Sequence, residues 1–241
     1  MRLYNDLAWI WSVVTPADSY QEEAENLWEI LCESLGQKPE NLLEFGCGGG
    51  YLASHLPKEM NLCLVDSSEA MLAESQRNNP GQRHILGDML SVNCGELFDC
   101  ILVHDAVMYL RSREEASALL ANCKKHLRPN GRLILIPDAV QETFYERTFT
   151  AKSESDYQGK PVSLVLTEWH WDRDANDDLV QVEFSILLRR NEEVEAVHES
   201  HEMLVLPLMQ WMESFHTTGL EQDFPNPPWI GGGEFFLLNL R

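Results

Sequence analysis

The residues with the clearest chemical potential are an acid and a run of glycines between positions 44 and 50. Glu44 ends a short apolar stretch, and Gly46, Gly48, Gly49 and Gly50 follow it closely. Glycine tolerates positive φ and lets a ligand approach the backbone, and a helix expected directly afterwards offers free N–H groups at its start. Such a turn is typical of α/β proteins that bind a nucleotide-like ligand, although a purely structural loop is the alternative.

A second acid strengthens the ligand-binding interpretation. The apolar run 61–65 ends in Asp66, twenty positions after Gly46. Acids at this distance from a glycine turn bind the hydroxyl groups of a ribose. The dinucleotide fingerprint G-x-G-x-x-G would need glycine where Tyr51 stands. An NAD(P)-dependent oxidoreductase is therefore disfavoured but stays an alternative.

The elements that must position these residues alternate between strands and helices up to residue 138. Strands are expected at 41–45, 61–65, 84–86, 98–103 and 132–137, and helices at 20–35, 50–56, 68–77 and 112–127. This rhythm predicts a parallel sheet with helices on both faces, with ligand-contacting residues at the carboxyl ends of the strands. The polar residues at such ends are Glu44, Asp66, Asp88, His104, Asp105 and Asp138.

The alternation of strands and helices ends after Asp138. A polar stretch reaches Lys160, and three strand-like runs then follow at 162–171, 179–190 and 194–206. Short polar turns join these runs, which predicts an antiparallel meander. A helix is expected at 208–218, where Gly219 ends it, and a last strand at 235–240.

Composition narrows the class of protein. The net charge of −21 disfavours nucleic acids and membrane surfaces as partners, and it suits either a cationic substrate or a solubilising surface. The six cysteines include no C-x-x-C pair, which fits a reducing cytoplasm and predicts no metal site. No signal peptide and no apolar run long enough to span a bilayer is visible.

The motifs together resemble a class I S-adenosylmethionine-dependent methyltransferase. Residues 42–50 resemble the first motif of that family, 64–66 the strand end with its ribose-binding acid, and 87–89 its adenine-side motif. Residues 98–110 resemble its fourth strand with the acceptor-facing loop, and 127–133 the turn before its fifth strand. Segments 18–24 and 198–219 are similar to those of amino-sugar N-methyltransferases, which tend to carry His where Tyr109 stands.

The resemblance implies an α/β fold with a doubly wound, mostly parallel seven-stranded sheet and an inserted antiparallel β subdomain before the last helix. It implies one domain, residues 1–241, with an N-terminal helical lid (1–37), a cofactor-binding core (38–138), a β insertion on the substrate side (139–206) and a C-terminal helix and strands (207–241). It also implies S-adenosyl-L-methionine as cofactor, S-adenosyl-L-homocysteine as its product, and a homodimer through the β insertion.

The same resemblance assigns residues to the cofactor. They are Tyr20, Glu44, Gly46, Cys47, Gly48, Asp66, Ser67, Met71, Gly87, Asp88, Met89 and His104. Glu44 is expected near the amino group, Asp66 at the ribose, and Asp88 at the adenine between Met71 and Met89. The acceptor is expected to be a small molecule, with N-methylation favoured over O-methylation; a cofactor-binding protein without activity is a further alternative.

An amine must be neutral to attack a methyl group, which requires a base or a proton path. The candidates are His104, Asp105, Tyr109 and His201. Each has a structural interpretation as well. His104 could offer only backbone contacts, Asp105 could cap a helix, Tyr109 could be a packing residue, and His201 could lie on the surface.

Overall fold

The structure is a computed structural model that describes residues 1–223 and 226–241. Its larger sheet has seven strands. In spatial order they are β10 (Leu220–Gln222), β11 (Phe236–Leu240), β5 (Leu127–Ile136), β4 (Phe98–His104), β1 (Asn41–Phe45), β2 (Asn61–Asp66) and β3 (Arg83–Leu86). The last five of these run parallel, whereas β11 is antiparallel to both β5 and β10. The predicted mostly parallel seven-stranded sheet is confirmed.

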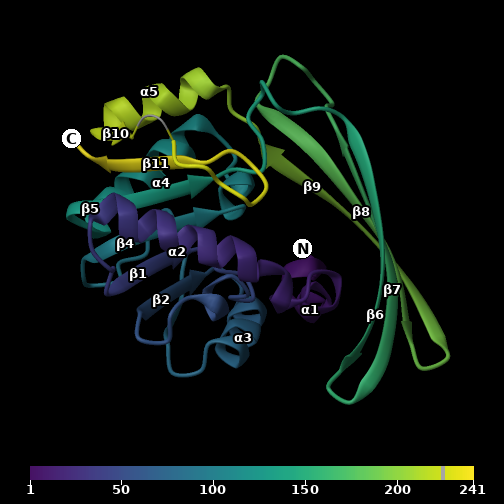
Figure 1. The fold of residues 1–241 in the computed structure, drawn as a ribbon. Helices are drawn as coiled ribbons and strands as arrows, with labels where there is room; N and C mark the ends of the chain where they lie inside the picture. Colours follow the sequence, from purple (N-terminus) through teal and green to yellow (C-terminus); the bar gives the residue numbers. More distant parts are fainter. Residues whose placement is uncertain (224–225) are drawn as a thin grey trace.

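Helices cover both faces of this sheet (Figure 1). They are α2 (Gln21–Leu35), α3 (Glu69–Asn78), α4 (Arg113–His126) and α5 (Leu208–Thr218). Alternate residues of β1 point to opposite cores: Leu42 packs with α2, whereas Leu43 and Phe45 pack with α4 and α5. Both faces of the sheet are therefore buried, as expected for parallel strands between helices.

The second sheet is an antiparallel meander of β6 (Arg147–Tyr157), β7 (Lys160–Trp171), β8 (Leu179–Arg190) and β9 (Glu193–Leu204). It lies between β5 and α5 in the chain, so the predicted insertion is confirmed. Strand β6, however, was expected to be an irregular polar stretch. It is an edge strand whose mostly exposed polar side chains show no apolar alternation, although it pairs with β7 along its full length.

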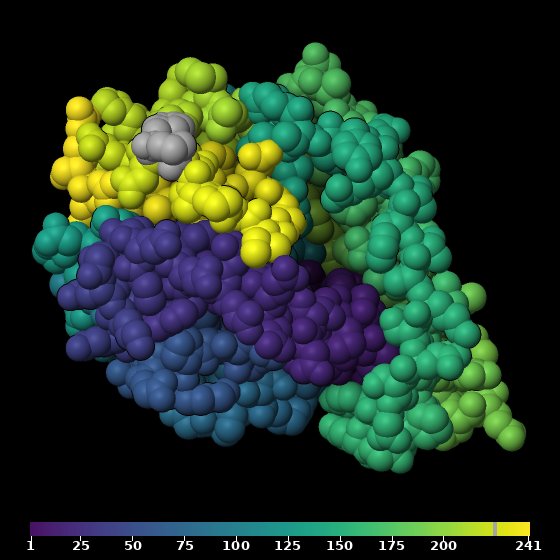
Figure 2. Space-filling view, viewed as in Figure 1, coloured from purple at the N-terminus to yellow at the C-terminus, as the bar shows by residue number. Residues whose placement is uncertain are grey.

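The N-terminal segment lies between the two sheets (purple in Figures 1 and 2). It consists of short helical turns: η1 (Arg2–Tyr4), η2 (Ala8–Ile10), α1 (Trp11–Val14) and η3 (Ala17–Tyr20). Its buried residues Leu3, Leu7, Ile10 and Val13 belong to the same core as the inner side chains of the antiparallel sheet. This segment thus joins the two sheets.

Two local expectations were wrong. The predicted helix at 50–56 is only the short turn η4 (Ala53–His55), because Gly50 has φ +64 and Pro57 forces Leu56 into extended backbone. The turn predicted before the fifth strand lies inside β5, where Asn130 has positive φ and the register with β4 shifts. In the part of the chain that the structure describes, no helix has both the length and the apolar character to cross a membrane.

Candidate active site

The parallel strands bring polar residues to one edge of the large sheet. Glu44 lies in β1, Asp66 ends β2, Asp105 follows β4, and Asp138 follows β5 after one proline. All four line one cavity of about 680 Å³. The cavity extends from the glycine turn to the inner face of the antiparallel sheet, which contributes Glu168, His170, Phe184 and Met203.

The glycine turn forms one wall of this cavity. Gly46 and Gly48 have φ values of +70 and +52, which other residues rarely adopt. A Cβ on Gly46 would overlap the side chain of Ala106, so glycine also allows the loop after β4 to pack against the turn. The backbone N–H of Gly48 donates to Oδ2 of Asp66, at 2.9 Å, which fixes the turn against the end of β2.

Glu44 is a buried carboxylate without a cation beside it in the described chain. The residue is only 4% exposed, and its Oε2 atom has no hydrogen-bond partner among the described residues. Burial, together with the negative charges of Asp66, Glu23 and Asp105, raises the pKa of this carboxyl to about 8. A buried carboxylate of this kind is suited to a positively charged ligand group.

Asp105 and Asp138 form a pair of carboxyls in the other half of the cavity. Their side chains hydrogen-bond to one another. Both open into the cavity, and desolvation there is the main cause that raises the pKa of Asp138 to about 8 and that of Asp105 to about 6. The pair therefore holds one proton near neutral pH, and Asp105 is the member that ionises first. Asp105 also has a φ of +52, a strained conformation of the kind found at functional sites.

His104 lies beside this pair as a neutral imidazole. Its Nε2 atom is 3.2 Å from Oδ1 of Asp105 and 3.2 Å from Oε1 of Glu23. Burial lowers the pKa of His104 more than the neighbouring charges raise it. His104 can therefore donate a hydrogen bond to a carboxylate while it carries no charge of its own.

Four aromatic rings form a further part of the cavity wall. Tyr4, Trp11, Tyr109 and Phe184 all line the cavity. The Tyr4 ring lies edge-on to that of Tyr109, with centroids 5.3 Å apart, and stacks with Trp11 at 6.0 Å. The N-terminal segment thus supplies two of the four rings, beside one from the loop after β4 and one from β8.

Most of the residues predicted for the site meet in this cavity. The predicted cofactor residues and three catalytic candidates line it: Tyr20, Glu44, Gly46, Cys47, Gly48, Asp66, Ser67, Met71, Gly87, Asp88, Met89, His104, Asp105 and Tyr109. The fourth candidate, His201, lies behind Tyr109 instead, with its Nδ1 atom 3.1 Å from the Tyr109 hydroxyl. The individual roles of these residues stay predictions.

The structure also tests the structural interpretations of His201 as a surface residue and of Asp105 as a helix cap. His201 is 3% exposed and is therefore no surface residue. Asp105 precedes the short helix η5 (Ala106–Tyr109), but its side chain makes no capping hydrogen bond. The structural interpretations of these two residues were wrong.

Several residues of the cavity were not predicted. Tyr4, Trp11, Tyr51, Glu168 and His170 line it as well. Glu168 and His170 alternate with outward residues of β7, so an inward-facing pattern could have indicated them once the strand was recognised. Tyr51 lies over Gly49, where a Cβ would overlap the Tyr51 ring, and stacks with Tyr20 at 6.1 Å.

Comparison with known proteins assigns the chain that forms this cavity to a family. Residues 43–135 match the methyltransferase domain. The dTDP-3-amino-3,4,6-trideoxy-alpha-D-glucopyranose N,N-dimethyltransferase of Streptomyces venezuelae is 27% identical over 169 residues, which are 69% of each chain. The chain is a class I S-adenosylmethionine-dependent methyltransferase.

Solved structures support the methyltransferase fold. Streptomyces venezuelae DesVI matches with a TM-score of 0.80 and 21% identity over 98% of this chain and 96% of its own. CalS10 with bound S-adenosylmethionine, an amino pentose methyltransferase from Micromonospora echinaspora, matches with a TM-score of 0.77 and 22% identity over 92% of each chain. The methyltransferase therefore resembles the amino-sugar N-methyltransferases.

The residues around the glycine turn fit S-adenosylmethionine. Glu44 offers an unpartnered buried carboxylate for the ammonium group, and Asp66 offers a carboxylate for the ribose hydroxyls. Asp88, Met71 and Met89 line the part of the cavity that would hold the adenine. When bound, this cofactor supplies a methyl group on a cationic sulfonium, which an acceptor lone pair displaces in line.

Replacing Asp66 by alanine is expected to weaken S-adenosylhomocysteine binding by about 1–3 kcal/mol, the usual scale for lost charge-assisted hydrogen bonds. Isothermal titration measures the change. Asp174→Ala, in the exposed turn between β7 and β8, is the matched control and is expected to bind as the wild type does. Unchanged affinity in Asp66→Ala would remove Asp66 from the cofactor site.

Proposed function

We propose that this methyltransferase transfers the methyl group to the nitrogen of a small-molecule amine. The observation that carries the proposal is the lining of the cavity beyond the glycine turn. Asp105, Asp138 and Glu168 line this part together with Tyr4 and Tyr109, and the charges of all three carboxylates act on the Tyr109 hydroxyl. Carboxylates and aromatic faces both attract an ammonium group, and its positive charge makes this attraction stronger than that for a neutral alcohol.

The charge balance of the whole cavity supports the same class of acceptor. Its described lining contains seven acidic side chains: Glu44, Asp66, Asp88, Asp105, Glu115, Asp138 and Glu168. Arg111 is the one lysine or arginine in that described lining, and its guanidinium pairs with Glu115 at 2.8 Å on the exposed rim. A cationic amine is therefore attracted to the cavity, and an anionic acceptor is repelled.

The acid pair also suits the proton chemistry of an amine. An ammonium group must lose a proton before its nitrogen can attack. Ionised Asp105 can accept that proton, while the proton on Asp138 stabilises the charge of Asp105 through their hydrogen bond. The N,N-dimethyltransferase of Streptomyces venezuelae is named for an amino sugar and CalS10 for an amino pentose, and an amino sugar is the acceptor type that we propose first.

Turnover of methyl-labelled cofactor tests this proposal. Amino sugars and simple amines are offered beside matched sugars and alcohols in which a hydroxyl replaces the amino group. We expect label in the amines and at least about tenfold less in the alcohols, a difference of about 1.4 kcal/mol in transition-state free energy. Equal labelling of both series, or labelling of the alcohols alone, would refute N-methylation.

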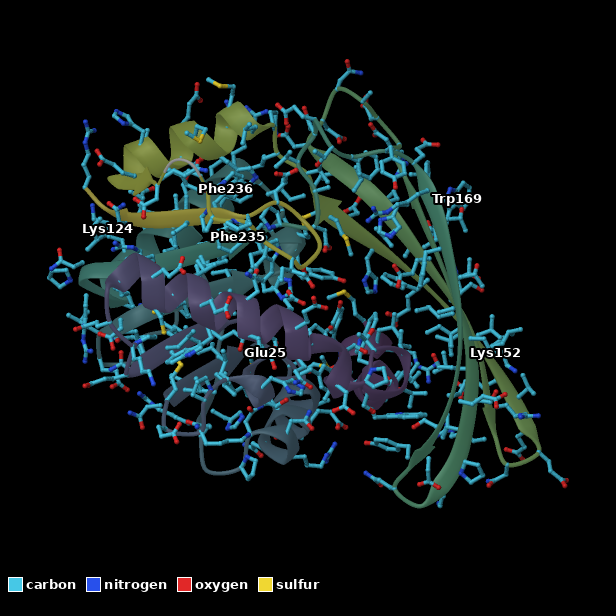
Figure 3. The ribbon with its side chains drawn as sticks, viewed as in Figure 1. Glu25, Lys124, Lys152, Trp169, Phe235 and Phe236 are labelled. Carbon is cyan, nitrogen blue, oxygen red and sulfur yellow. The ribbon has the colours of Figure 1, made fainter. Side chains whose placement is uncertain are left out.

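We also propose that the partners of this protein are its small-molecule acceptor and a second copy of the chain, and neither nucleic acid nor membrane. The outer face of the antiparallel sheet carries Trp169 and Leu187, which are 50% and 51% exposed, and Figure 3 shows Trp169 on the side away from the large sheet. Apolar side chains on an exposed sheet face support a contact between copies. Sedimentation velocity tests this, and a monomer at all concentrations would contradict it.

A further inference from the structure

A chain of hydrogen bonds runs from the aromatic wall of the cavity into the protein. The hydroxyl of Tyr4 lies 2.6 Å from the hydroxyl of Tyr109, which lies 3.1 Å from Nδ1 of His201. Nε2 of His201 lies 2.9 Å from Oε2 of Glu199. Tyr4 and Tyr109 line the cavity, whereas His201 and Glu199 stand behind them in β9.

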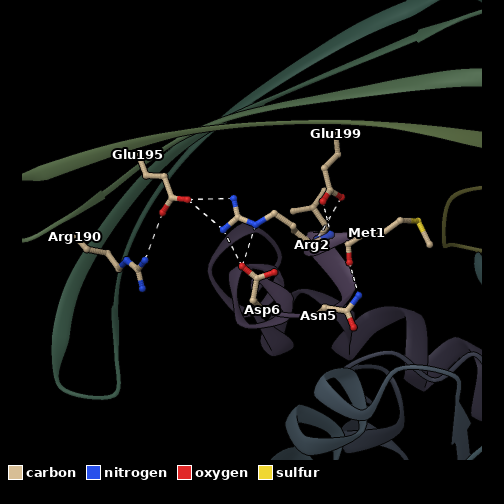
Figure 4. Close-up of polar contacts among 8 residues, drawn as sticks. Met1, Arg2, Asn5, Asp6, Arg190, Glu195 and Glu199 are labelled. Carbon is tan, nitrogen blue, oxygen red and sulfur yellow. Dashed lines mark hydrogen bonds and ion pairs between the residues drawn. The ribbon is translucent and has the colours of Figure 1, made fainter.

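Glu199 also holds the N-terminal segment. Its carboxylate accepts hydrogen bonds from the backbone N–H groups of Arg2 and Leu3 (Figure 4). The same turn is also tied to the cofactor side, because the Ser68 hydroxyl donates to the backbone carbonyl of Tyr4. One carboxylate thus contacts both the segment that carries Tyr4 and the histidine behind Tyr109.

The charge of Glu199 decides how protons are arranged along this chain. Burial would raise the pKa of its carboxyl, but hydrogen bonds from His201 and from the Arg2 and Leu3 backbone hold that pKa below its ordinary value. Ionised Glu199 can only accept hydrogen bonds. In a neutral His201 the proton therefore lies on Nε2, and Nδ1 is an acceptor.

This tautomer sets the direction of both hydroxyls. Tyr109 donates to Nδ1 of His201, and Tyr4 donates to the oxygen of Tyr109. Both O–H groups then point away from the ligand, and their oxygen lone pairs are offered to the cavity. An amine can donate its N–H groups to these oxygens and keep its own lone pair free for attack.

The opposite tautomer would have the opposite effect. With the proton on Nδ1, His201 would donate to the oxygen of Tyr109, and the Tyr109 hydroxyl would have to donate elsewhere. Directed into the cavity, that O–H group would bond to the amine lone pair and make it unavailable.

We propose that Glu199 is a positioning residue for methyl transfer: it fixes the Nε2–H tautomer of His201 and the position of Tyr4, so that the Tyr4 and Tyr109 hydroxyls accept hydrogen bonds from the amine. This inference rests on the proposed N-methylation. It assigns a role in that reaction to Glu199, a residue that does not touch the acceptor.

The test is Glu199→Gln. Glutamine keeps a carbonyl oxygen for the Arg2 N–H group, but its amide nitrogen donates to Nε2 and so reverses the tautomer. Nitrogen-15 NMR of labelled histidine is expected to show the proton of His201 on Nε2 in the wild type and on Nδ1 in the variant. We expect kcat for an amine to fall about 10- to 100-fold. KM and S-adenosylhomocysteine affinity are expected to stay within about twofold of the wild type.

Two further variants separate positioning from folding. Glu199→Asp keeps the acceptor-only carboxylate and is expected to keep the wild-type tautomer and to recover part of kcat. Glu195→Gln, in the same strand, loosens the ion pairs of Glu195 with the guanidinium groups of Arg2 (3.2 Å) and Arg190 (3.6 Å, Figure 4). Because it leaves the contacts of Glu199 in place, it is expected to leave tautomer and turnover unchanged.

Three results would overturn the proposal. They are an Nδ1–H tautomer in the wild type, a reversed tautomer with unaltered amine turnover, and a loss of cofactor affinity that parallels the loss of kcat. Failure of the proposed function looks different, because a wild type that methylates alcohols and no amine would refute N-methylation while the tautomer measurement still stands.

Discussion

Replacing Glu44 by glutamine is expected to weaken S-adenosylhomocysteine binding by about 2–4 kcal/mol at pH 8, the scale of breaking one side of a buried charge pair. Glutamine has the shape of glutamate but no charge, and no described side chain would replace the lost attraction for the ammonium group of the ligand. Isothermal titration measures the loss. Glu40→Gln, an exposed residue directly before the same strand, is the control and is expected to bind as the wild type does.

The pH dependence of binding separates the charge of Glu44 from its shape. In the free protein the pKa of Glu44 is raised to about 8, so below that pH the carboxyl must lose its proton before it can pair with an ammonium group. Wild-type affinity is therefore expected to rise by up to about tenfold for each pH unit between pH 6 and 8 and then to level off. The glutamine variant is expected to lack this rise, and a retained rise would exclude Glu44 as its source.

The same substitution is expected to stabilise the protein without ligand. Because the folded state holds a proton on Glu44 that the unfolded state has already lost, the free energy of unfolding falls as the pH rises from about 4.5 to about 8. Glu44→Gln removes this penalty, so the variant is expected to exceed the wild type by about 2–4 kcal/mol at pH 8 and to match it near pH 4. Denaturant unfolding at the two pH values measures the difference.

Local patterns were sufficient to predict the sheet and the cofactor side of the cavity. Glu44, Gly46 and Asp66 lie within or next to two neighbouring parallel strands, and residues that end adjacent parallel strands meet at one edge whatever the rest of the chain does. The ends of two helices were also predictable, because the contacts that fix them are local in sequence. Ser68 caps α3 through a bond three residues away, and Gly219 ends α5 in the left-handed conformation.

The acceptor side was harder to predict because long-range contacts build it. Tyr4 reaches Tyr109 across 105 positions of sequence, and Tyr109 reaches His201 across 92. The hydrophobic periodicity within one segment of sequence cannot predict contacts between segments so far apart. Strand β6 was missed because its residues are exposed or half-exposed and none is buried, so the strand has no buried face that would give an apolar pattern.

Asp105→Asn is expected to lower kcat/KM for an amine by about 10²- to 10³-fold at pH 7, within the usual contribution of a general base. Asparagine tolerates the positive φ of this position better than most residues do, so the backbone is expected to stay in place. Cofactor affinity is therefore expected to change by less than about threefold. In the wild type kcat/KM is expected to rise with pH through about 6 as Asp105 ionises, and the variant is expected to lack this limb.

Asp138→Asn distinguishes the two members of the acid pair. The asparagine amide can donate to Asp105 as the protonated Asp138 carboxyl does, so Asp105 stays ionised and its hydrogen bond is kept. We expect a loss in kcat/KM of less than about fivefold, because only the partner of the base has changed. If Asp138→Asn were as damaging as Asp105→Asn, the base would be Asp138 or the pair would act as one unit. If Asp105→Asn alone were harmless, the proton of the amine would leave by another route, and the chain that begins at Tyr109 would be the one to examine.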